Sequence, residues 1–305
     1  MLIYAQHERN FAVSEKYCDF SADYKNLTIY NELGVEDIKF PMVVSVPHAG
    51  RVFPPEFLEH TPLTIEQLRT NEDLFADELA APLAQYGIPV LSMQIARAFI
   101  DANRDKIELD AKMFYDYPAD KIAIENNRCR FGLGLIHRID ADNNCIYEGL
   151  LSYKEVQERI KNVYDVYHKR LQYLIGKCVK KFGFCLLLDY HSMPSKICNI
   201  IPDNPQVDCC LGDLFSQSCP LQYTEFLQQQ LKEKGYMVTI NIPYSGAFTT
   251  FNYCQPRKKI YTLQLEINRE LYSDEKSLTK NTNFQKVSSD MTMAIHALAK
   301  KILDF

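Results

Sequence analysis

Apolar residues follow two patterns along this chain: short unbroken runs, and longer stretches with apolar positions three and four residues apart. Unbroken runs bounded by turn residues are typical of buried strands, and they predict strands at residues 40–47, 88–95, 185–191, 236–241 and 260–268. The helical spacing predicts helices at residues 62–86, 152–182, 220–234 and 284–303. Strands that alternate with long helices predict a single-domain α/β fold, with a mixed, mostly parallel sheet and helices on both faces.

Capping motifs and local composition indicate where helices begin and where the leader and a long loop lie. Thr64-x-x-Gln67 and Ser152-x-x-Glu155 are capping-box patterns at the starts of two predicted helices. Residues 1–38 are mixed and polar, and we expect an N-terminal leader that packs on a main domain at 39–305. Residues 105–130 are irregular, polar and rich in tyrosine, which favours a long active-site loop.

Bulk composition narrows the function classes. The chain has 305 residues, 47% of them hydrophobic and 24% charged, as in an ordinary globular protein. Its net charge is −5 and its longest basic run is Arg257-Lys258-Lys259, so nucleic acid is not an expected partner. We expect no membrane segment and no signal peptide, hence a cytoplasmic protein. The ten cysteines form no C-x-x-C pair and are expected to be reduced thiols. The oligomeric state stays open.

Two histidines each follow an apolar run. His48 follows Val43-Val44-Ser45-Val46-Pro47, and His191 lies in Cys185-Leu186-Leu187-Leu188-Asp189-Tyr190-His191-Ser192-Met193. Open α/β sheets place their chemistry where strands end. A lone histidine at such a place is usually structural, but two of them indicate a shared centre. Zinc hydrolases use three protein ligands and leave a position open for water, so His48 and His191 are candidate zinc ligands.

Carboxylates and arginines complete the candidate site. A third ligand is available from Glu72, Asp73 or Asp77, although a carboxylate at a helix start can simply offset the helix dipole. Arg97 and Arg104 flank a segment that follows a strand, and they predict either a clamp for an anionic substrate or ion pairs with Asp101.

Glu266 lies inside the apolar strand Leu263-Gln264-Leu265-Glu266-Ile267-Asn268. A buried carboxylate without a partner is costly. Glu266 is therefore either the general base for a water activated by the metal or half of a buried ion pair with an arginine.

Short segments with a recognisable pattern run in order over residues 40–272: Val46-Pro47-His48-Ala49-Gly50, Asp73-x-x-x-Asp77, Arg97-x-x-x-Asp101-x-Asn103-Arg104, Gly132-Leu133-Gly134, Tyr167-His168, Asp189-Tyr190-His191-Ser192-Met193, Gly212-Asp213, Asn241-x-Pro243-Tyr244-x-Gly246 and Gln264-Leu265-Glu266-Ile267-Asn268. In these segments the chain resembles the N-formylglutamate amidohydrolase family, which is related in fold to zinc carboxypeptidases and aspartoacylases.

This resemblance implies a zinc-carboxypeptidase-like fold and a zinc-dependent amidohydrolase that cleaves an N-formyl or N-acyl amino acid. It implies zinc ligation by His48, Asp73 and His191, and activation of the water by Glu266. It also implies that the substrate is bound by Arg97, Asn103, Arg104, Tyr244 and Gly246. His168 is expected to be structural, and His137 is left unassigned. The alternative functions are a small-peptide zinc carboxypeptidase and a catalytically silent binding protein of the same fold.

The sequence departs from the family pattern at a few positions. Ala49 replaces a serine, and Asn71 replaces an aspartate. The segment Gly212-Asp213-Leu214-Phe215-Ser216 lacks the family arginine, which Leu214 replaces. Because arginines commonly bind carboxylates of substrates, this change leaves glutamate open as the amino acid that is released.

Overall fold

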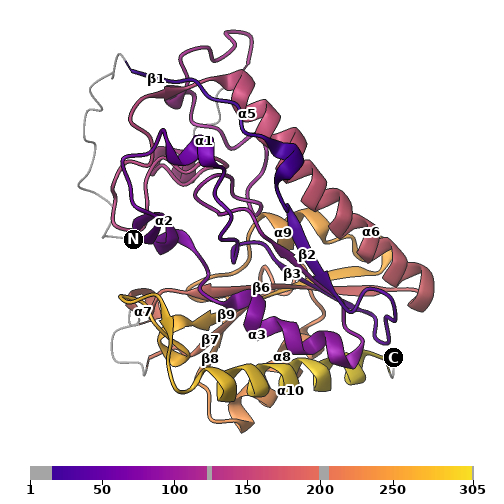
Figure 1. Cartoon of the computed structure of the whole chain (residues 1–305). Helices are drawn as coiled ribbons and strands as arrows, with labels where there is room; N and C mark the ends of the chain where they lie inside the picture. The colour runs from indigo at the N-terminus through magenta and orange to yellow at the C-terminus, as the bar shows by residue number, and fades with distance from the viewer. Residues whose placement is uncertain (1–15, 122–125, 199–205, 304–305) are drawn as a thin grey trace.

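The computed structural model describes residues 16–121, 126–198 and 206–303, arranged around one central sheet (Figure 1). The sheet has seven strands in the order β2-β4-β3-β6-β9-β7-β8. Their bounds are Tyr30–Leu33, Val90–Met93, Met42–Val46, Cys185–Met193, Ile260–Asn268, Cys209–Gly212 and Val238–Ile240. Four of the six strand pairs are parallel, whereas β2 with β4 and β7 with β9 are antiparallel. The sheet is therefore mixed and mostly parallel, as predicted.

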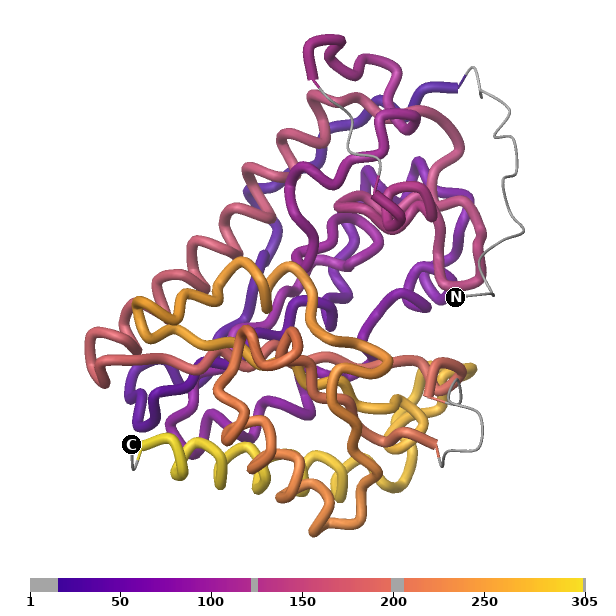
Figure 2. Tube along the Cα trace, turned by 180° about the vertical axis from the view of Figure 1, so that it is seen from behind, coloured from indigo at the N-terminus to yellow at the C-terminus, as the bar shows by residue number. Residues whose placement is uncertain are grey.

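Helices cover both faces of the sheet. One face carries α5 (Tyr153–Arg159), α6 (Asp165–Phe182) and α9 (Phe248–Tyr253), and the other carries α3 (Ala76–Ala80), α8 (Leu221–Glu233) and α10 (Phe284–Leu303) (Figure 1). Seen from behind, the described residues of 95–121 and 126–150 lie on the same side of the sheet as α6 (Figure 2). The fold thus has three layers, with the long connection on the α6 side.

Short elements complete the structure. These are α1 (Pro55–Leu58), α2 (Ile65–Leu68), α4 (Asn127–Arg130) and α7 (Ser195–Cys198), with the two-stranded pairs β1 (Tyr17–Cys18) with β5 (Leu150–Leu151) and β10 (Ser273–Asp274) with β11 (Thr279–Lys280). A π-helical segment at 160–164 joins α5 to α6.

Alternation along the strands decides which face each side chain occupies. Leu186 and Leu188 of β6 pack in the core under α3, α8 and α10, together with Leu263 and Leu265 of β9. The residues between them point to the α6 face. This face therefore receives the polar residues at the carboxyl ends of β6 and β9, and the candidate site lies there.

Most predicted elements are confirmed, and two strands of the central sheet were not predicted. The strands at 40–47, 88–95, 185–191, 236–241 and 260–268 correspond to β3, β4, β6, β8 and β9, and the helices at 152–182, 220–234 and 284–303 correspond to α5–α6, α8 and α10. The strands β2 and β7 have no prediction, because Asn31 and Glu32 interrupt the apolar residues of β2, and the apolar run of β7 is limited to Cys209-Cys210-Leu211 between Asp208 and Gly212.

The single helix predicted at 62–86 is wrong. The capping box of Thr64 and Gln67 is present, but α2 ends at Leu68 and α3 begins only at Ala76. Between them the chain turns through Phe75, which has a left-handed φ of 56°. This turn brings Asp73 into the interior, so a contact distant in sequence overrides the helical pattern.

The N-terminal leader is only partly described. Residues 1–15 lie outside the described residues, and β2 at 30–33 pairs with the edge of the central sheet. The boundary at residue 38 stays a prediction. In the described ranges, no helix has both the length and the apolar character needed to cross a membrane.

Candidate functional site

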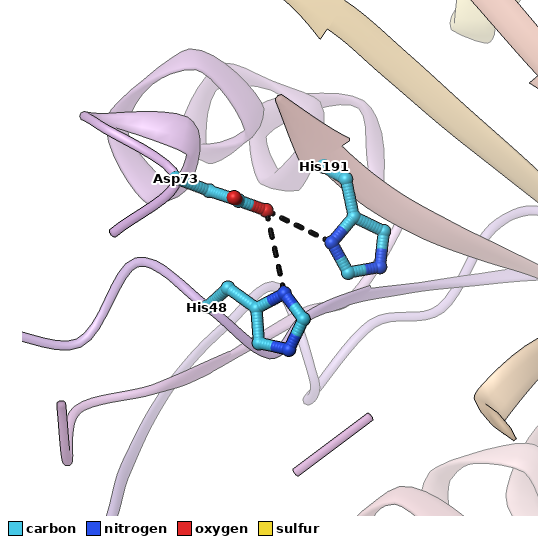
Figure 3. Close-up of side chains that lie close together, drawn as sticks. All are labelled: His48, Asp73 and His191. Atoms are coloured by element: carbon cyan, nitrogen blue, oxygen red, sulfur yellow. Dashed lines mark hydrogen bonds and ion pairs between the residues drawn. The ribbon is translucent and has the colours of Figure 1, made fainter. Parts of the chain in front are cut away.

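Three side chains converge at the carboxyl ends of β3 and β6. The Oδ2 atom of Asp73 lies 2.9 Å from Nδ1 of His191 and 3.5 Å from Nδ1 of His48 (Figure 3). The two imidazole centroids are 4.8 Å apart. All three residues are buried. The strand-end histidines, about 140 residues apart in sequence, are thus neighbours in the fold, as expected for parallel adjacent strands.

The structure selects one carboxylate from the three sequence candidates. Asp73 faces the histidines, and its backbone N–H donates to the carbonyl of His48 at 3.0 Å. Glu72 instead accepts from Arg51 at 2.6 Å and from Arg69 at 2.7 Å. Asp77 also accepts from Arg51, at 3.1 Å. Glu72 and Asp77 are therefore committed to arginines, and Asp73 alone of the three joins the histidines.

A second ring of carboxylates holds the far side of each imidazole. Nε2 of His48 lies 2.7 Å from Asp101, and Nε2 of His191 lies 3.0 Å from Asp189. Both aspartates are fully buried. With a metal bound, the hydrogen of each ring would lie on Nε2 beside its outer carboxylate, and each Nδ1 would be free to bind the ion next to Asp73. Carboxylates in this position orient histidines that bind metals and raise their basicity.

The charges of the centre are strongly coupled. Burial by itself would raise the pKa of Asp73, but hydrogen bonds with His191 and His48 hold that pKa well below 3.8. Arg269 adds a contact of 3.1 Å to the other oxygen of Asp73. Burial would lower the pKa of His191, yet the Asp189 carboxylate keeps it well above 6.5. In this geometry Asp73 is an anion at neutral pH.

The three residues fit a zinc ion. Their ligand atoms all lie within 4.8 Å of one another. Tetrahedral ligands at about 2.0–2.1 Å from zinc are roughly 3.3 Å apart, close to the two distances between Asp73 and the histidines. Two imidazole nitrogens, one carboxylate oxygen and an outer ring of carboxylates form a donor set that suits zinc.

Glu266 lies beside this centre on β9. It is the register partner of His191, on the same face of the sheet. Its carboxylate accepts a hydrogen bond from the Gln264 amide at 2.9 Å. Burial raises the pKa of Glu266 to about 8. Arg269, whose charge acts on Glu266, is paired with Asp73 instead, so the geometry favours the general-base hypothesis over the buried ion pair.

The two predicted substrate arginines have different environments. Arg97 pairs with Asp101 at 2.8 Å through Nε, which is the ion pair considered from sequence. Arg104 is 3.9 Å from Asp101 and donates instead to the backbone carbonyls of Leu133 and Asn103, at 3.0 and 2.9 Å. Burial lowers the pKa of Arg104. A buried guanidinium held mainly by carbonyls still attracts an anion.

Asn103 is engaged at both ends of its amide. Its Nδ2 donates to Asp189 at 3.0 Å and lies next to Nε2 of His191, and its Oδ1 accepts from the backbone N–H of Thr249 at 2.7 Å. These contacts do not favour the predicted contact between Asn103 and substrate. They assign Asn103 a positioning role, because it helps to hold the carboxylate that orients His191.

The loop after β8 closes another side of the site. Burial raises the pKa of Tyr244, and the charges of Glu266, Arg97, Arg269 and Asp73 also act on its hydroxyl. The charges of four site residues thus reach the hydroxyl of Tyr244. Gly246 has a φ of 130° and stands against Leu214, so this loop approaches the end of β7 closely. Substrate contact by Tyr244 and Gly246 stays a prediction.

Sequence reasoning did not assign roles to four residues of the site. Asp189 lies two residues before His191 in one strand, and this spacing alone places both on the same face. Arg269 directly follows β9 at the edge of the sheet where the other site residues lie. Asp101 accepts from His137 at 3.1 Å in addition to its contact with His48. His137 lies in the long connection between β4 and β5, and no sequence pattern there predicts its contact with Asp101.

Two other histidine predictions can be compared with the structure. His168 lies in α6 and contacts the Tyr253 hydroxyl at 2.7 Å and the Ala102 carbonyl at 2.9 Å. These contacts agree with a structural role. His137 also lies 3.4 Å from the amide of Asn71, so the residue that replaces the family aspartate lies next to the Asp101 network.

Comparison with known proteins finds relatives that are similar to this chain over most of its length. N-formylglutamate deformylases of Pseudomonas putida and Pseudomonas aeruginosa are 26% and 25% identical over 78% of this chain, covering 83% and 84% of their own lengths. The crystal structure of an N-formylglutamate amidohydrolase from Ralstonia eutropha JMP134 superposes with a TM-score of 0.84, at 29% identity over 90% of this chain and 98% of that chain.

A gene product of Agrobacterium tumefaciens shares the fold, with a TM-score of 0.63 at 14% identity over 89% of this chain and 96% of that chain. The sequence profile of one family, described as N-formylglutamate amidohydrolase, matches residues 40–273. That segment runs from the strand before His48 to just beyond Arg269 and so contains the whole candidate site. The chain belongs to the N-formylglutamate amidohydrolase family.

Proposed function

We propose that this protein is a zinc-dependent amidohydrolase that cleaves an N-formyl or N-acyl amino acid, of the N-formyl-L-glutamate type, to a carboxylate and a free amino acid. One observation carries the proposal: His48, Asp73 and His191 converge next to Glu266 at one edge of the sheet. The relatives named N-formylglutamate deformylase support the choice of reaction.

The metal would be held by the two Nδ1 atoms of His48 and His191 and by Oδ2 of Asp73. When bound, zinc supplies a Lewis acid for the amide carbonyl and lowers the pKa of a water toward about 7. Asp101 and Asp189 keep both imidazoles in the tautomer that leaves Nδ1 available. The outer carboxylates thereby orient the ligands before an ion arrives.

Glu266 would accept a proton from the attacking water and pass it to the leaving amine. A general base works best when its pKa lies near the working pH, and burial places the pKa of Glu266 at about 8. The hydrogen bond from Gln264 fixes one carboxylate oxygen, at 2.9 Å. The other oxygen is available to the water.

Arg104 would hold the α-carboxylate of the substrate. Its Nε and Nη1 atoms are held by backbone carbonyls, which sets the plane of the guanidinium. Arg97 pairs with the same oxygen of Asp101 that lies 3.9 Å from Arg104, and its charge also acts on Asp73 and Glu266. This pair of arginines favours an anionic substrate over a neutral amide.

The decisive experiment compares substrates on the zinc-loaded and the chelated protein. We expect formate release from N-formyl amino acids, with N-formyl-L-glutamate among the compounds tested, and loss of that activity on chelation. Turnover of dipeptides with no deformylation would indicate a carboxypeptidase. Absence of both activities in protein that binds no zinc would contradict the proposal and favour a binding protein.

A further inference from the structure

We propose that Leu214 and Gln264 read the side chain of the released amino acid, and that the preferred substrate carries an uncharged carboxamide there rather than a carboxylate. The substrate class would be N-formyl derivatives of glutamine-type amino acids. This inference rests on the proposed function and specifies one group of the substrate. It comes from a set of residues that we call the side-chain wall: Gly212, Leu214, Gly246, Thr250 and Gln264.

The side-chain wall is joined to the candidate site at two points. Gln264 donates to Glu266 at 2.9 Å. At the other end, Thr249, which precedes Thr250, donates its backbone N–H to Asn103 at 2.7 Å, and Asn103 precedes Arg104. The wall therefore extends from the proposed base to the segment that would hold the α-carboxylate. The side chain of an amino acid branches from the carbon that carries this carboxylate.

The members of the wall contact one another closely. A methyl group built on Gly246 would lie 2.9 Å from Cδ2 of Leu214 and 3.0 Å from Cγ2 of Thr250. A methyl group on Gly212 would lie 2.7 Å from the backbone carbon of Ser245. Gly212 is also the register partner of Gln264 on the neighbouring strand. Leu214 is only half-buried.

The chemistry of the wall favours a donor over an anion. None of its five residues carries a charge. The Oε1 atom of Gln264 is buried and has no hydrogen-bond partner among the described residues, while the nitrogen of the same amide is fixed by Glu266. A buried acceptor without a donor is costly. A carboxamide N–H₂ would donate to Oε1, whereas a carboxylate would place a second acceptor and an unpaired charge there.

The arginines of the site are committed elsewhere. Arg269 pairs with Asp73 at 3.1 Å, and Arg97 pairs with Asp101 at 2.8 Å. Arg104 is the residue proposed for the α-carboxylate. A second carboxylate on the substrate would therefore compete for a cation that already has a role. An uncharged side chain avoids that competition.

The experiment measures kcat/KM of the zinc-loaded protein for N-formyl-L-glutamine and N-formyl-L-glutamate, which differ only in the terminal group. We expect the glutamine derivative to be favoured by about 10- to 100-fold. Leu214→Arg should place a cation at the wall and shift the ratio toward glutamate by a similar factor. Leu214→Met, of similar size and no charge, should keep the original preference.

Phe215→Arg is the matched control for added charge. Phe215 is the next residue, has a similar left-handed φ of 57° and is 69% exposed. Phe215→Arg should change the ratio of kcat/KM for the two substrates by no more than about twofold, because an exposed charge is screened. A wild-type preference for N-formyl-L-glutamate would overturn the inference while leaving the proposed function intact. If neither compound is hydrolysed, the proposed function itself fails. Melting temperatures verify that each variant is folded, and the wild-type ratio tests the inference even if Leu214→Arg does not fold.

Discussion

Replacing Glu266 by glutamine tests whether Glu266 is the general base or half of a buried ion pair. The two hypotheses predict changes of opposite sign in the free energy of unfolding. The substitution keeps the size of the side chain and the oxygen that accepts from Gln264. It removes the proton acceptor and the charge. If Glu266 is the general base, turnover should fall by about 10²–10⁴, and the stability of the metal-free protein should rise at neutral and alkaline pH.

The expected gain follows from the pKa of Glu266, which burial raises from 4.5 to about 8. Between these values Glu266 has lost its proton in the unfolded chain and still holds it in the folded chain, so the contribution of Glu266 to wild-type stability falls as pH rises. Each pKa unit corresponds to about 1.36 kcal/mol. At about pH 7.5 the cost approaches roughly 4 kcal/mol, and near pH 4.5 it is below about 0.5 kcal/mol. Glutamine removes this cost.

Denaturant unfolding of chelated wild type and of the chelated variant, at both pH values, measures this difference. We expect the variant to be more stable at pH 7.5 and equal at pH 4.5. If Glu266 is half of a buried ion pair, the variant should instead lose about 3–5 kcal/mol at neutral pH. A variant that keeps wild-type turnover after zinc loading would refute the catalytic argument, whatever its stability.

Three further predictions follow from the same geometry. His48→Ala and His191→Ala should each lose bound zinc in elemental analysis, while His60→Ala, whose half-buried ring packs on Phe20, should keep it. Full occupancy in the first two variants would exclude the assigned ligands. Arg104→Lys should raise KM for a free acid but not for its carboxyl-amidated analogue, because the planar fork is lost; equal effects on both would argue against the clamp. Burial lowers the pKa of His168 to about 4, so the unfolded chain alone gains this proton, and the contribution of His168 to stability should fall by about 3 kcal/mol between pH 7.5 and pH 4. In urea titrations, His168→Gln should remove that contribution and so change the slope of stability against pH by this amount. An unchanged slope would show that His168 is not buried as a neutral base.

Local patterns were sufficient for the framework of the fold. Unbroken apolar runs identified the long strands β6 and β9, and helical spacing identified α6 and α10, because each signal repeats over many residues. The helix predicted at 62–86 failed for the opposite reason. Its apolar spacing continues across a turn whose purpose is to bring Asp73 to the histidines, and no local signal reports a partner more than 100 residues away.

The sequence by itself determined the candidate chemistry: His48 and His191 follow apolar runs, and Glu266 interrupts one, so each is conspicuous in its own segment. Only the tertiary structure decided which carboxylate joins the histidines, because Asp73 and its neighbours differ in their arginine partners and not in local pattern. It also decided that Asn103 holds Asp189 and that Leu214 stands against Gly246. These contacts join segments far apart in the chain, and their energies depend on burial and distance, which exist only after the sheet has formed.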